Sequence, residues 1–532
     1  MVKRIRTLYR SRFFFTALLI IPLFCEAQKT YEATGDIKVA KQFFLFGDYA
    51  TALKEFQFLY ALDSTVADYY YPLGICYLNT NIDKTKAIPF LEKVVAQKDF
   101  DEEAMYQLGA AYQSSYRFDD AIDCFKKFKT LAPGKDKNFI SADRRIEMCN
   151  NGKELIQHPV NVTFENVGAK INSPYPDYNP FINKNETAMY YASKRSGNNG
   201  DLLDYDGYNT ADVFASENSY GEWSKGRRLA PTFNTPLVEE TVGMSADAKE
   251  LFIYADNLDA KLQTVVSVRE GKSFQTLKPL GSSINAGGDG ATAACVTPDK
   301  KIIFFASARP EGVGGIDIYM ANLLPTGQWG PAKNLGKTIN SQYDESYPYI
   351  TPDGKTLYFA SEGHNSMGGY DIFRSEWDRE KNTFSEPVNI GYPVNTPDDN
   401  TTICFTGSGR YAYISALRKD SYGNLDIYRV TFNDIIAGYT TVKANLVVKD
   451  SVDMLSAMNK NIKITVQDAS TQELTGNYKP NKNGRFIVIL KPGEYTITIN
   501  CDGYQQLKES IKIENREMPV KEITRTFRLT SI

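Results

Sequence analysis

Hydrophobic and polar positions follow two different patterns along the chain. Up to about residue 150, small and aromatic residues recur with a long period, and the small residues Ala52, Ala87 and Ala121 lie 35 and 34 residues apart. After residue 160, short apolar segments alternate with turns that contain Gly, Pro and Asp, which is typical of strands. The pattern therefore predicts helices in the N-terminal part and an all-β remainder.

The helical part consists of repeats of 34 residues. In the unit that starts at Glu102, the recurring positions are Leu108, Gly109, Tyr112, Ala121, Phe125 and Pro133. Two upstream units repeat parts of this pattern, with Leu73, Gly74 and Tyr77 in one and Ala52 and Phe56 in the other. Small residues let paired helices approach closely, while aromatic residues fill the space between them. The pattern resembles the tetratricopeptide repeat, in three copies over residues 31–155, with a capping helix over 141–155.

In tetratricopeptide repeats the first helix of each pair lines a concave groove. The resemblance implies that the groove is lined by Lys41, Phe44, Tyr71, Leu78, Tyr106 and Gln113. Two interpretations stay open. The groove binds a peptide or a partner protein, or it packs against the next domain of the same chain.

A second repeat covers residues 160–437. Its marker is an asparagine after an apolar residue, with separations of 62, 51, 55 and 55 between Asn172, Asn234, Asn285, Asn340 and Asn395. Each unit contains short strands and turns such as 351–354, Thr-Pro-Asp-Gly, and four strands per unit is typical of a propeller blade. We predict five blades, with six as the alternative, and a ring closed by residues 160–168 as fourth strand of the last blade. The pattern resembles the TolB-type propeller of bacterial envelope proteins.

One face of this propeller carries the candidate binding residues. Loops before the first strand and after the second strand of each blade share a face, which gathers Asp289, Arg309, Asp344, Glu345 and His364. They could recognise a peptide or a glycan. The favoured alternative is structural, because recurrence in several blades suits residues that satisfy backbone groups.

Nothing in this region predicts catalysis. The Gly-x-Ser-x-Gly motif is absent around His364 and Ser366. The acidic loop with Asp201, Asp204 and Asp206 lacks the spacing of a calcium loop, so a solvated insertion is favoured over a calcium site. We therefore expect no catalytic residues, no metal and no cofactor.

Residues 440–532 alternate as strands do and predict a β-sandwich of the immunoglobulin or prealbumin type. Three segments, at 483–486, 492–495 and 502–504, resemble the carboxypeptidase regulatory-like domain. That domain carries no catalysis in its family, so the resemblance does not imply a peptidase. The predicted fold class is thus multidomain α + β, with helical repeats, a propeller and a sandwich in that order.

The N-terminus predicts export. Five basic residues precede the apolar run 13–24, which is too short to span a membrane, and cleavage is expected before Gln28. Residues 1–27 are therefore interpreted as a signal peptide. A lipid anchor on Cys25 is the less favoured alternative, because Phe24 is bulky where a lipobox has a small residue. The expected location is the periplasm, in association with the outer membrane.

Composition narrows the function further. With 42% apolar and 23% charged residues the chain is neither disordered nor a multi-span membrane protein, and a net charge of −3 gives no reason to expect nucleic acid. The chain contains only 2 histidines, which leaves little room for histidine-based catalysis.

The order of modules resembles Bacteroidetes envelope proteins, some of which serve type IX secretion. Many of those carry an OmpA-like domain, for which we find no segment here. The resemblance implies a non-enzymatic scaffold that binds envelope or outer-membrane proteins. A glycan- or peptidoglycan-associated binding protein is the alternative.

Overall fold

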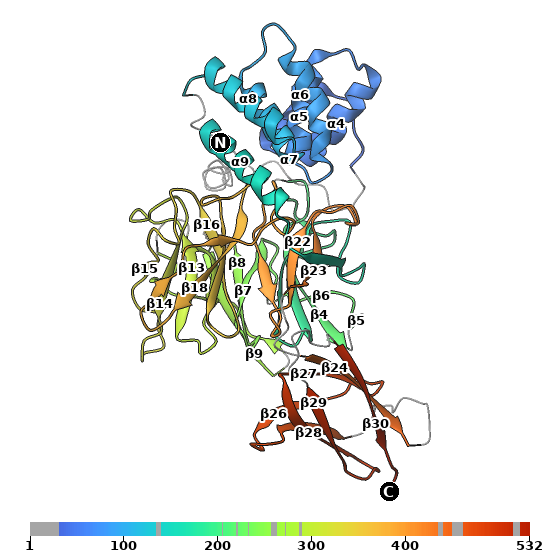
Figure 1. Ribbon diagram of the computed structural model, residues 1–532. Helices are drawn as coiled ribbons and strands as arrows, with labels where there is room; N and C mark the ends of the chain where they lie inside the picture. Colours follow the sequence, from blue (N-terminus) through green and yellow to red (C-terminus); the bar gives the residue numbers. More distant parts are fainter. Residues whose placement is uncertain are drawn as a thin grey trace.

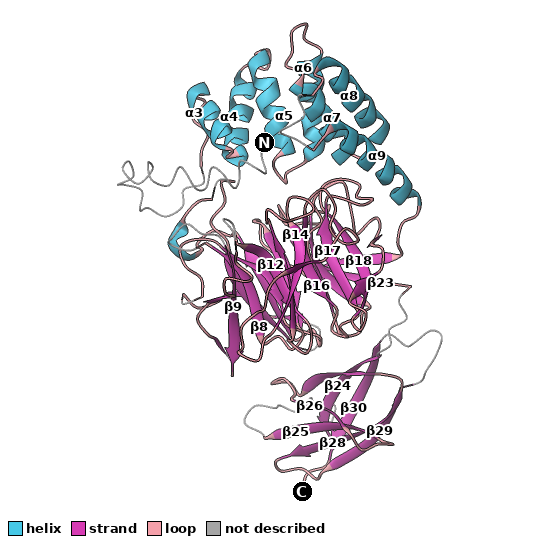
Figure 2. Ribbon diagram, turned by 90° about the vertical axis from the view of Figure 1, so that its left-hand side faces the viewer, coloured by secondary structure: helices cyan, strands magenta, loops and turns pink. Residues whose placement is uncertain are grey.

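The protein has three parts, stacked in the order of the sequence (Figure 1). The computed structural model describes residues 31–134, 140–204, 206–219, 222–231, 233–256, 263–271, 273–286, 290–434, 440–449, 461–513 and 522–532. The predicted signal peptide with Cys25, and the candidate residue Asp289, lie outside these ranges. The helical part covers one face of the propeller, and the sandwich lies beyond the opposite face (Figure 2).

The helical part consists of helix pairs, each packed on the next. The α-helices in its described residues are α3 (Ile37–Phe46), α4 (Tyr49–Leu62), α5 (Tyr70–Leu78), α6 (Ala87–Val95), α7 (Glu103–Ser114), α8 (Phe118–Leu131) and α9 (Ala142–Gln157). Short 3₁₀ turns, η1 (Ala67–Tyr69) and η2 (Lys84–Lys86), precede α5 and α6. The last helix, α9, packs on α8 as the expected capping helix.

Small residues allow the close approach of these helices. A β-carbon at Gly74 would lie 2.6 Å from Cγ of Leu91, and one at Gly109 would lie 2.8 Å from the ring of Phe125. The repeat-marking Ala52, Ala87 and Ala121 are fully buried. The residue spacing in the sequence therefore has the predicted physical basis, which is helix contact without room for a larger side chain.

The described part of the propeller contains five antiparallel sheets around a central axis, as the sequence predicts. The first three blades comprise β2 (Asp177–Ile182), β3 (Ala188–Ser193), β4 (Asp212–Ser219), β5 (Glu222–Trp223) and β6 (Arg227–Arg228); β7 (Glu239–Met244), β8 (Glu250–Ala255), β9 (Gln263–Glu270), β10 (Ser273–Phe274) and β11 (Lys278–Pro279); and β12 (Ala291–Val296), β13 (Ile302–Ser307), β14 (Asp317–Asn322) and β15 (Lys333–Asn334).

The last two blades complete the ring. They comprise β16 (Glu345–Ile350), β17 (Thr356–Ser361), β18 (Asp371–Asp378), β19 (Thr383–Phe384) and β20 (Val388–Asn389); and β21 (Ile403–Phe405), β22 (Tyr411–Ala416), β23 (Asp426–Phe432) and β1 (Val162–Asn166). β1 pairs antiparallel with β23, from Val162 opposite Phe432 to Asn166 opposite Tyr428. The prediction that residues 160–168 supply the fourth strand of the last blade is confirmed.

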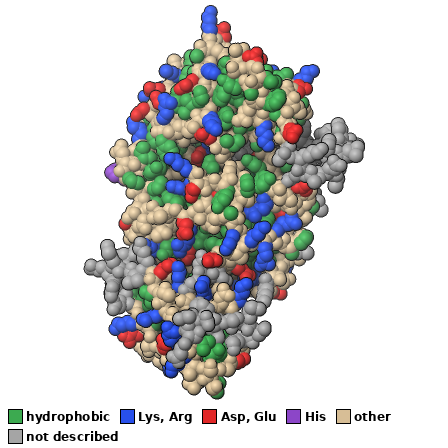
Figure 3. Space-filling view, turned by 90° about the vertical axis from the view of Figure 1, so that its right-hand side faces the viewer, with side chains coloured by type: hydrophobic (Ala, Val, Ile, Leu, Met, Phe, Trp, Pro, Cys, Tyr) green, Lys and Arg blue, Asp and Glu red, His purple; other side chains and the backbone are tan. Residues whose placement is uncertain are grey.

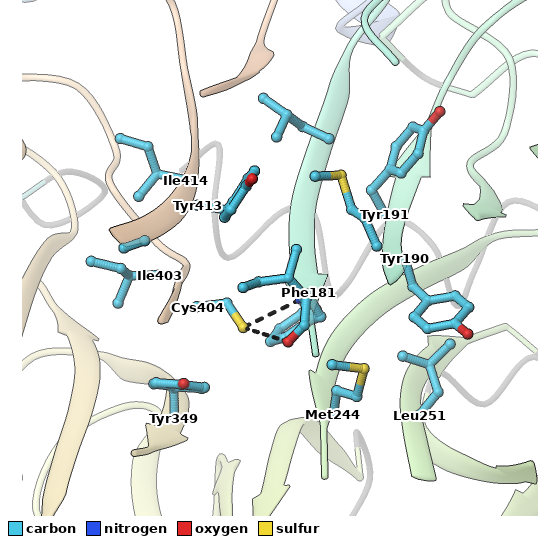
Figure 4. Close-up of a cluster of buried hydrophobic side chains, with 14 of the residues drawn as sticks. Phe181, Tyr190, Tyr191, Met244, Leu251, Tyr349, Ile403, Cys404, Tyr413 and Ile414 are labelled. Atoms are coloured by element: carbon cyan, nitrogen blue, oxygen red, sulfur yellow. Dashed lines mark hydrogen bonds between the residues drawn. The ribbon is translucent and has the colours of Figure 1, made fainter. Parts of the chain in front are cut away.

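Side chains reinforce this closure between the first and last blades. Glu186 accepts hydrogen bonds from Nε of Arg429 at 2.8 Å and from the hydroxyl of Tyr413 at 3.0 Å. Sγ of Cys404 lies 3.4 Å from the amide nitrogen of Ile182 and 3.5 Å from its carbonyl oxygen, within the apolar cluster drawn in Figure 4. The six cysteines of the described residues are all free and buried, so Cys404 and its equivalent Cys295 are packed as small apolar groups, as expected.

The marker asparagines hold the blades together. Asn172, Asn234, Asn340 and Asn395 each bond both the backbone N–H and the carbonyl of one residue in a third strand, at 2.8–3.0 Å; these residues are Ile427, Val213, Ile318 and Ile372. Asn285 bonds the carbonyl of Thr264 in β9. These four asparagines thereby supply an acceptor for a buried strand amide and a second donor for the carbonyl of the same residue, which also accepts a backbone amide.

Three blades extend this pairing into a chain of side chains. In the fourth blade, Asn395 donates to Asn389, which donates to Asp371 at the start of β18, at 2.8 and 2.7 Å. Asn340, Asn334 and Asp317 repeat the arrangement in the third blade, and Asn172, Asn166 and Asp426 repeat it in the last. Recurrence at equivalent places identifies these residues as structural.

The C-terminal part is a sandwich of two sheets. One contains β27 (Arg485–Leu490), β24 (Thr440–Val448) and β30 (Glu522–Leu529), and the other contains β26 (Leu474–Tyr478), β25 (Ile462–Asp468), β28 (Gly493–Cys501) and β29 (Leu507–Ile513). Alternate residues of both sheets, such as Val442 and Ile497, share one buried core.

We expect Asn395→Ala to lower the free energy of unfolding of the propeller by about 1–3 kcal/mol, because it leaves the buried amide of Ile372 without its acceptor, while the carbonyl of Ile372 still accepts from the amide of Ile390. Urea unfolding followed by tryptophan fluorescence measures the change. Asn365→Ala, at an exposed position of the same blade, is the control and should change it by less than about 0.5 kcal/mol. Equal stability of the two variants would contradict the role of Asn395.

Candidate functional site

The two surfaces that the sequence nominates for binding face each other. The loops after the second strands and the connectors before the first strands lie on the propeller face that the helical domain covers (Figure 2). The main contact is the loop between β17 and β18, which α9 and α7 meet. We call this contact the interlock and define it by Arg144, Gln113, Glu362, Ser366 and Met367.

Arg144 supplies most of the polar contacts of the interlock. It lies in the first turn of α9, where the hydroxyl of Ser141 caps the helix by accepting from the amide of Arg144. Its Nη2 donates to the carbonyl of Glu362 at 2.7 Å and to the hydroxyl of Ser366 at 2.9 Å, and both Nη atoms lie 3.1 Å from the carbonyl of His364. The guanidinium also stacks on Tyr343, 4.7 Å from the ring centre. One buried cation thus satisfies several carbonyls of the loop.

Met367 supplies the apolar contact. Its side chain has no exposed surface and belongs to the same buried cluster as the helical core. Nε2 of Gln113 donates to its carbonyl at 3.2 Å, and Nη1 of Arg145 in turn donates to Oε1 of Gln113. Within the propeller, the loop packs closely on the connector to the last blade, because a β-carbon at Gly368 would be 2.1 Å from the carbonyl of Pro397. The propeller therefore contributes a core residue to the helical domain.

Further contacts surround the interlock. Nζ of Lys84 lies 2.5 Å from a carboxylate oxygen of Asp398, and Asn81 donates to Asn424 at 2.9 Å. The rings of Tyr116 and Tyr392 meet edge to face at 5.9 Å. These pairs come from the turns between helices, so the edge of the helical array rests on the propeller.

The predicted groove residues fall into two groups. Tyr106 and Gln113 are only 2% and 1% exposed, because α9 covers them and Arg145 bonds both. The remaining four retain accessible surface: Lys41 is exposed, and Phe44, Tyr71 and Leu78 are half-buried. The interpretation in which the groove packs within the chain therefore describes its C-terminal end, where Tyr106 and Gln113 are core residues.

The predicted propeller residues that the structure describes are bonded within the propeller. Glu345 has no exposed surface and accepts bonds from the hydroxyls of Ser341 and Ser361, both at 2.6 Å. Arg309 donates to the carbonyls of Ser283 and Ile284 and stacks on Tyr319. His364 bonds the carbonyl of Ile339 at 2.9 Å through its ring, and burial lowers its pKa. All three residues serve the blades, which is the alternative that the sequence favoured.

Asp344 follows the same rule. One carboxylate oxygen accepts the amide of Ile316 at 2.9 Å, and Asp399 repeats this contact with the amide of Tyr370 at 3.0 Å in the next blade. Like Arg309 and His364, Asp344 is half-buried, and its recurring contact identifies it as structural.

Several carboxyl groups of the propeller are buried enough to change their ionisation. Burial raises the pKa of Glu239, Glu345 and Asp371 to about 7 in each case. Glu239 and Glu345 occupy the start of a first strand, and each accepts from a Ser or Thr four residues earlier, as Asp177 does in the first blade. A shifted pKa that recurs with the fold reflects burial more than catalysis.

The acidic loop of the first blade encloses a lysine. Nζ of Lys194 lies 2.8 Å from Asp204 and 2.6 Å from Asp206, and these carboxylates keep its pKa above the usual range despite burial. No group of three His, Cys, Asp or Glu residues in the described ranges has the arrangement of a metal site. No helix of the described chain has the length and apolar character needed to cross a membrane.

Sequence reasoning missed Arg144 and Met367. Met367 matches Val313 of the third blade, since the amide of each bonds the aspartate four residues later. Only the contact with the helical domain distinguishes the two, so no local signal could have identified it.

Comparison with known proteins gives a similarity of fold alone. No family model matches the chain, and no curated protein matches it. Solved structures similar to it include TolB from Acinetobacter baumannii, with 13% identity, 55% of this chain and 70% of that chain covered, and a TM-score of 0.32. A GH43 β-xylosidase/α-arabinofuranosidase from a compost microbial metagenome has 12% identity, 51% and 94% coverage, and a TM-score of 0.33. An endo-arabinase from Bacteroides thetaiotaomicron has 15% identity, with 48% of this chain and 93% of that chain covered, and a TM-score of 0.31.

These matches cover about half of the chain. Enzymes and a TolB protein are both among them, and TM-scores this low carry no argument about activity. The function has to be argued from the residues.

We expect Arg144→Ala to loosen the interlock, because four hydrogen bonds to the 362–366 loop are lost. Amide hydrogen exchange in residues 362–369 should become at least about tenfold faster. Lys153→Ala, which removes an exposed ion pair of the same helix to Asp119, is the control and should leave this loop unchanged. Unchanged exchange in Arg144→Ala would show that the helical domain is held elsewhere.

Glu345→Gln should make stability less dependent on pH. A folded carboxyl with a pKa of about 7 binds its proton more tightly than an unfolded one, which titrates near about 4.3. Stability from this group is therefore present at about pH 4.5 and is lost as pH rises through about 7. Between about pH 5 and pH 8, the free energy of unfolding of the variant should rise relative to that of wild type by on the order of 2 kcal/mol, as measured by urea unfolding. Glu473→Gln, at an exposed position, is the control and should show no such rise in the free energy of unfolding.

Proposed function

We propose that this chain is a non-enzymatic, exported scaffold of the cell envelope that binds partner proteins. The helical domain and the propeller act as one platform, and the sandwich is a further module at its end. Partners are envelope or outer-membrane proteins, and the resemblance stated above favours assemblies of the type IX secretion class. Binding through several modules gives affinity by avidity more than by one deep pocket.

The interlock is the observation that carries this proposal. Arg144 and Met367 join two modules that are each typical of protein binding, so that surfaces on both are presented in a fixed relation. An enzyme would need a recess with groups free to react, whereas Glu345, Arg309 and His364 are bonded within the blades.

Exposed apolar side chains support a binding role for the helical domain. Leu45 and Phe46 at the end of α3 are 82% and 66% exposed, and Leu62 at the end of α4 is also exposed. On the face in Figure 3, hydrophobic side chains are visible over the helical domain, while Lys and Arg side chains gather over the propeller. Such surfaces are more typical of recognition than of an isolated soluble enzyme.

Affinity capture of the tagged chain from gently solubilised envelopes tests the proposal. We expect at least one envelope protein at near-stoichiometric recovery. Purified partner should rebind the wild-type chain and bind the Arg144→Ala, Met367→Ala double variant at least about threefold less, because the platform is loosened. Lys153→Ala should bind as wild type.

Two outcomes would contradict the proposal. Recovery of the chain alone, under conditions that preserve other envelope complexes, would favour the glycan- or peptidoglycan-binding alternative. Turnover of an envelope substrate by the purified chain would show that it is an enzyme.

A further inference from the structure

The turn between β21 and β22 in the last blade differs from the equivalent turns of the other blades. In the second, third and fourth blades the third residue of this turn is an aspartate: Asp247, Asp299 and Asp353. Each of these carboxylates accepts the hydroxyl of the residue that opens the turn and the amide two residues later. The last blade has Ser408 instead, whose hydroxyl lies 2.8 Å from that of Thr406 and accepts from the amide of Arg410 at 3.3 Å. The turn thus keeps its hydrogen bonds but carries no negative charge.

The cation of this turn is buried. Arg410 is 3% exposed, whereas the residues at the equivalent position of the other three turns are exposed: Lys249, Lys301 and Lys355. The amide of Phe432 donates to the carbonyl of Arg410 at 2.9 Å, so the backbone here continues the ladder between β22 and β23. Burial of the cation does not recur in those three turns, and it is therefore not a requirement of the blade fold.

The guanidinium of Arg410 lacks partners. Within the described residues, neither its Nε nor its Nη2 has a hydrogen-bond acceptor. Arg144 is buried to the same extent, but its Nη2 donates to two carbonyls and a hydroxyl. The ring of Tyr411 lies 5.8 Å from the guanidinium of Arg410, and Arg429 stacks on the same ring at 3.7 Å. A buried cation without hydrogen bonds is costly, so Arg410 requires a partner that Arg144 already has.

The charge of Arg410 is also unbalanced. In the part of the chain that the structure describes, no carboxylate forms an ion pair with it. At the turn of the first blade, Glu186 pairs with Arg429. At the turn of the fourth blade, Asp353 accepts from the hydroxyl and the amide of its own turn. A negative group from outside these ranges is needed to neutralise Arg410.

The two nitrogens without partners suit an oxyanion. Nε and Nη2 lie on one edge of the guanidinium, and their parallel N–H bonds match two oxygens of a carboxylate or phosphate group. Water satisfies the hydrogen bonds of such an edge but does not balance its charge. We propose that this edge of Arg410 binds a small oxyanion, a carboxylate or a phosphate, at the turn where three other blades carry an aspartate.

This site lies on the propeller face opposite the helical domain. The turn joins the first and second strands of its blade, whereas the loop of the interlock joins the second and third strands, so the two lie at opposite ends of the strands. The sandwich lies beyond the same face (Figure 2). The inference adds a ligand to the propeller and does not depend on the proposed scaffold function.

Thermal unfolding of the full chain, followed by tryptophan fluorescence, tests the inference, because all 3 tryptophans lie in the propeller. Replacing about 50 mM chloride by phosphate or by acetate at constant ionic strength should raise the Tm of wild type by at least about 2 °C, since an anion that binds only the folded state stabilises it. The anion that gives the larger rise identifies the oxyanion as phosphate or carboxylate.

Three variants separate the site from a general salt effect. Ser408→Asp supplies the carboxylate that the other turns contain, so its Tm in chloride should rise and its response to oxyanions should fall below about a third of that of wild type. Arg410→Met removes the buried charge and should lose the response. Lys355→Gln removes a cation at the equivalent exposed position and, as the control, should respond as wild type does. Ser408→Asp decides the question if Arg410→Met does not fold.

Three results would overturn the inference. Absence of a rise with either oxyanion would show that water alone occupies the site. An equal rise in Arg410→Met would show a general effect of salt and an adventitious ion only. An undiminished rise in Ser408→Asp would place the anion elsewhere. None of these results changes the outcome expected for capture of envelope partners, which tests the scaffold function separately.

Discussion

The pairing of β1 with β23 is the interaction on which the arrangement of the molecule depends. A propeller has no free edge only when its last blade is complete, and here the missing strand comes from residues 162–166. Closure has a second consequence. Because only four residues separate the end of α9 at Gln157 from the start of β1 at Val162, the strand that closes the ring also holds the helical domain at the rim of the propeller. The amide of Val160 donates to the carbonyl of Tyr392 at 2.7 Å and fixes this short connection.

Closure of the ring brings the helical domain next to the propeller, and the interlock provides the specific contact between them. A buried arginine would be costly without partners, and Arg144 finds them in the carbonyls of the 362–366 loop. Met367 adds apolar burial in the helical core. The same contact makes the C-terminal end of the predicted groove, with Tyr106 and Gln113, part of an internal interface.

The repeated side chains of the propeller show why few of its polar residues are available for chemistry. At the blade junctions, asparagines at equivalent positions accept buried strand amides, such as those of Ile318 and Ile372, and aspartates in turn hold the asparagine chains in place. A polar residue that recurs at the same place in the blades therefore serves the fold, because the backbone groups that it bonds recur there too. The backbone of the first strands follows the same rule, since Asn179 in β2 and Tyr347 in β16 both have a φ of about +50° at the bulge of their strand.

The sequence by itself determined the elements and their order. Helix pairs follow from small residues at Gly74 and Gly109, and blades follow from turns and asparagines at regular spacing, because these constraints are local or repeat along the chain. It also indicated that strand 160–168 completes the last blade, through its likeness to an equivalent segment. The tertiary structure alone decided which face the helical domain covers and which candidate residues are buried. The physical reason is that Arg144 binds main-chain carbonyls more than 200 residues away in the sequence. Because every residue has a main-chain carbonyl, the sequence does not indicate which residues Arg144 binds.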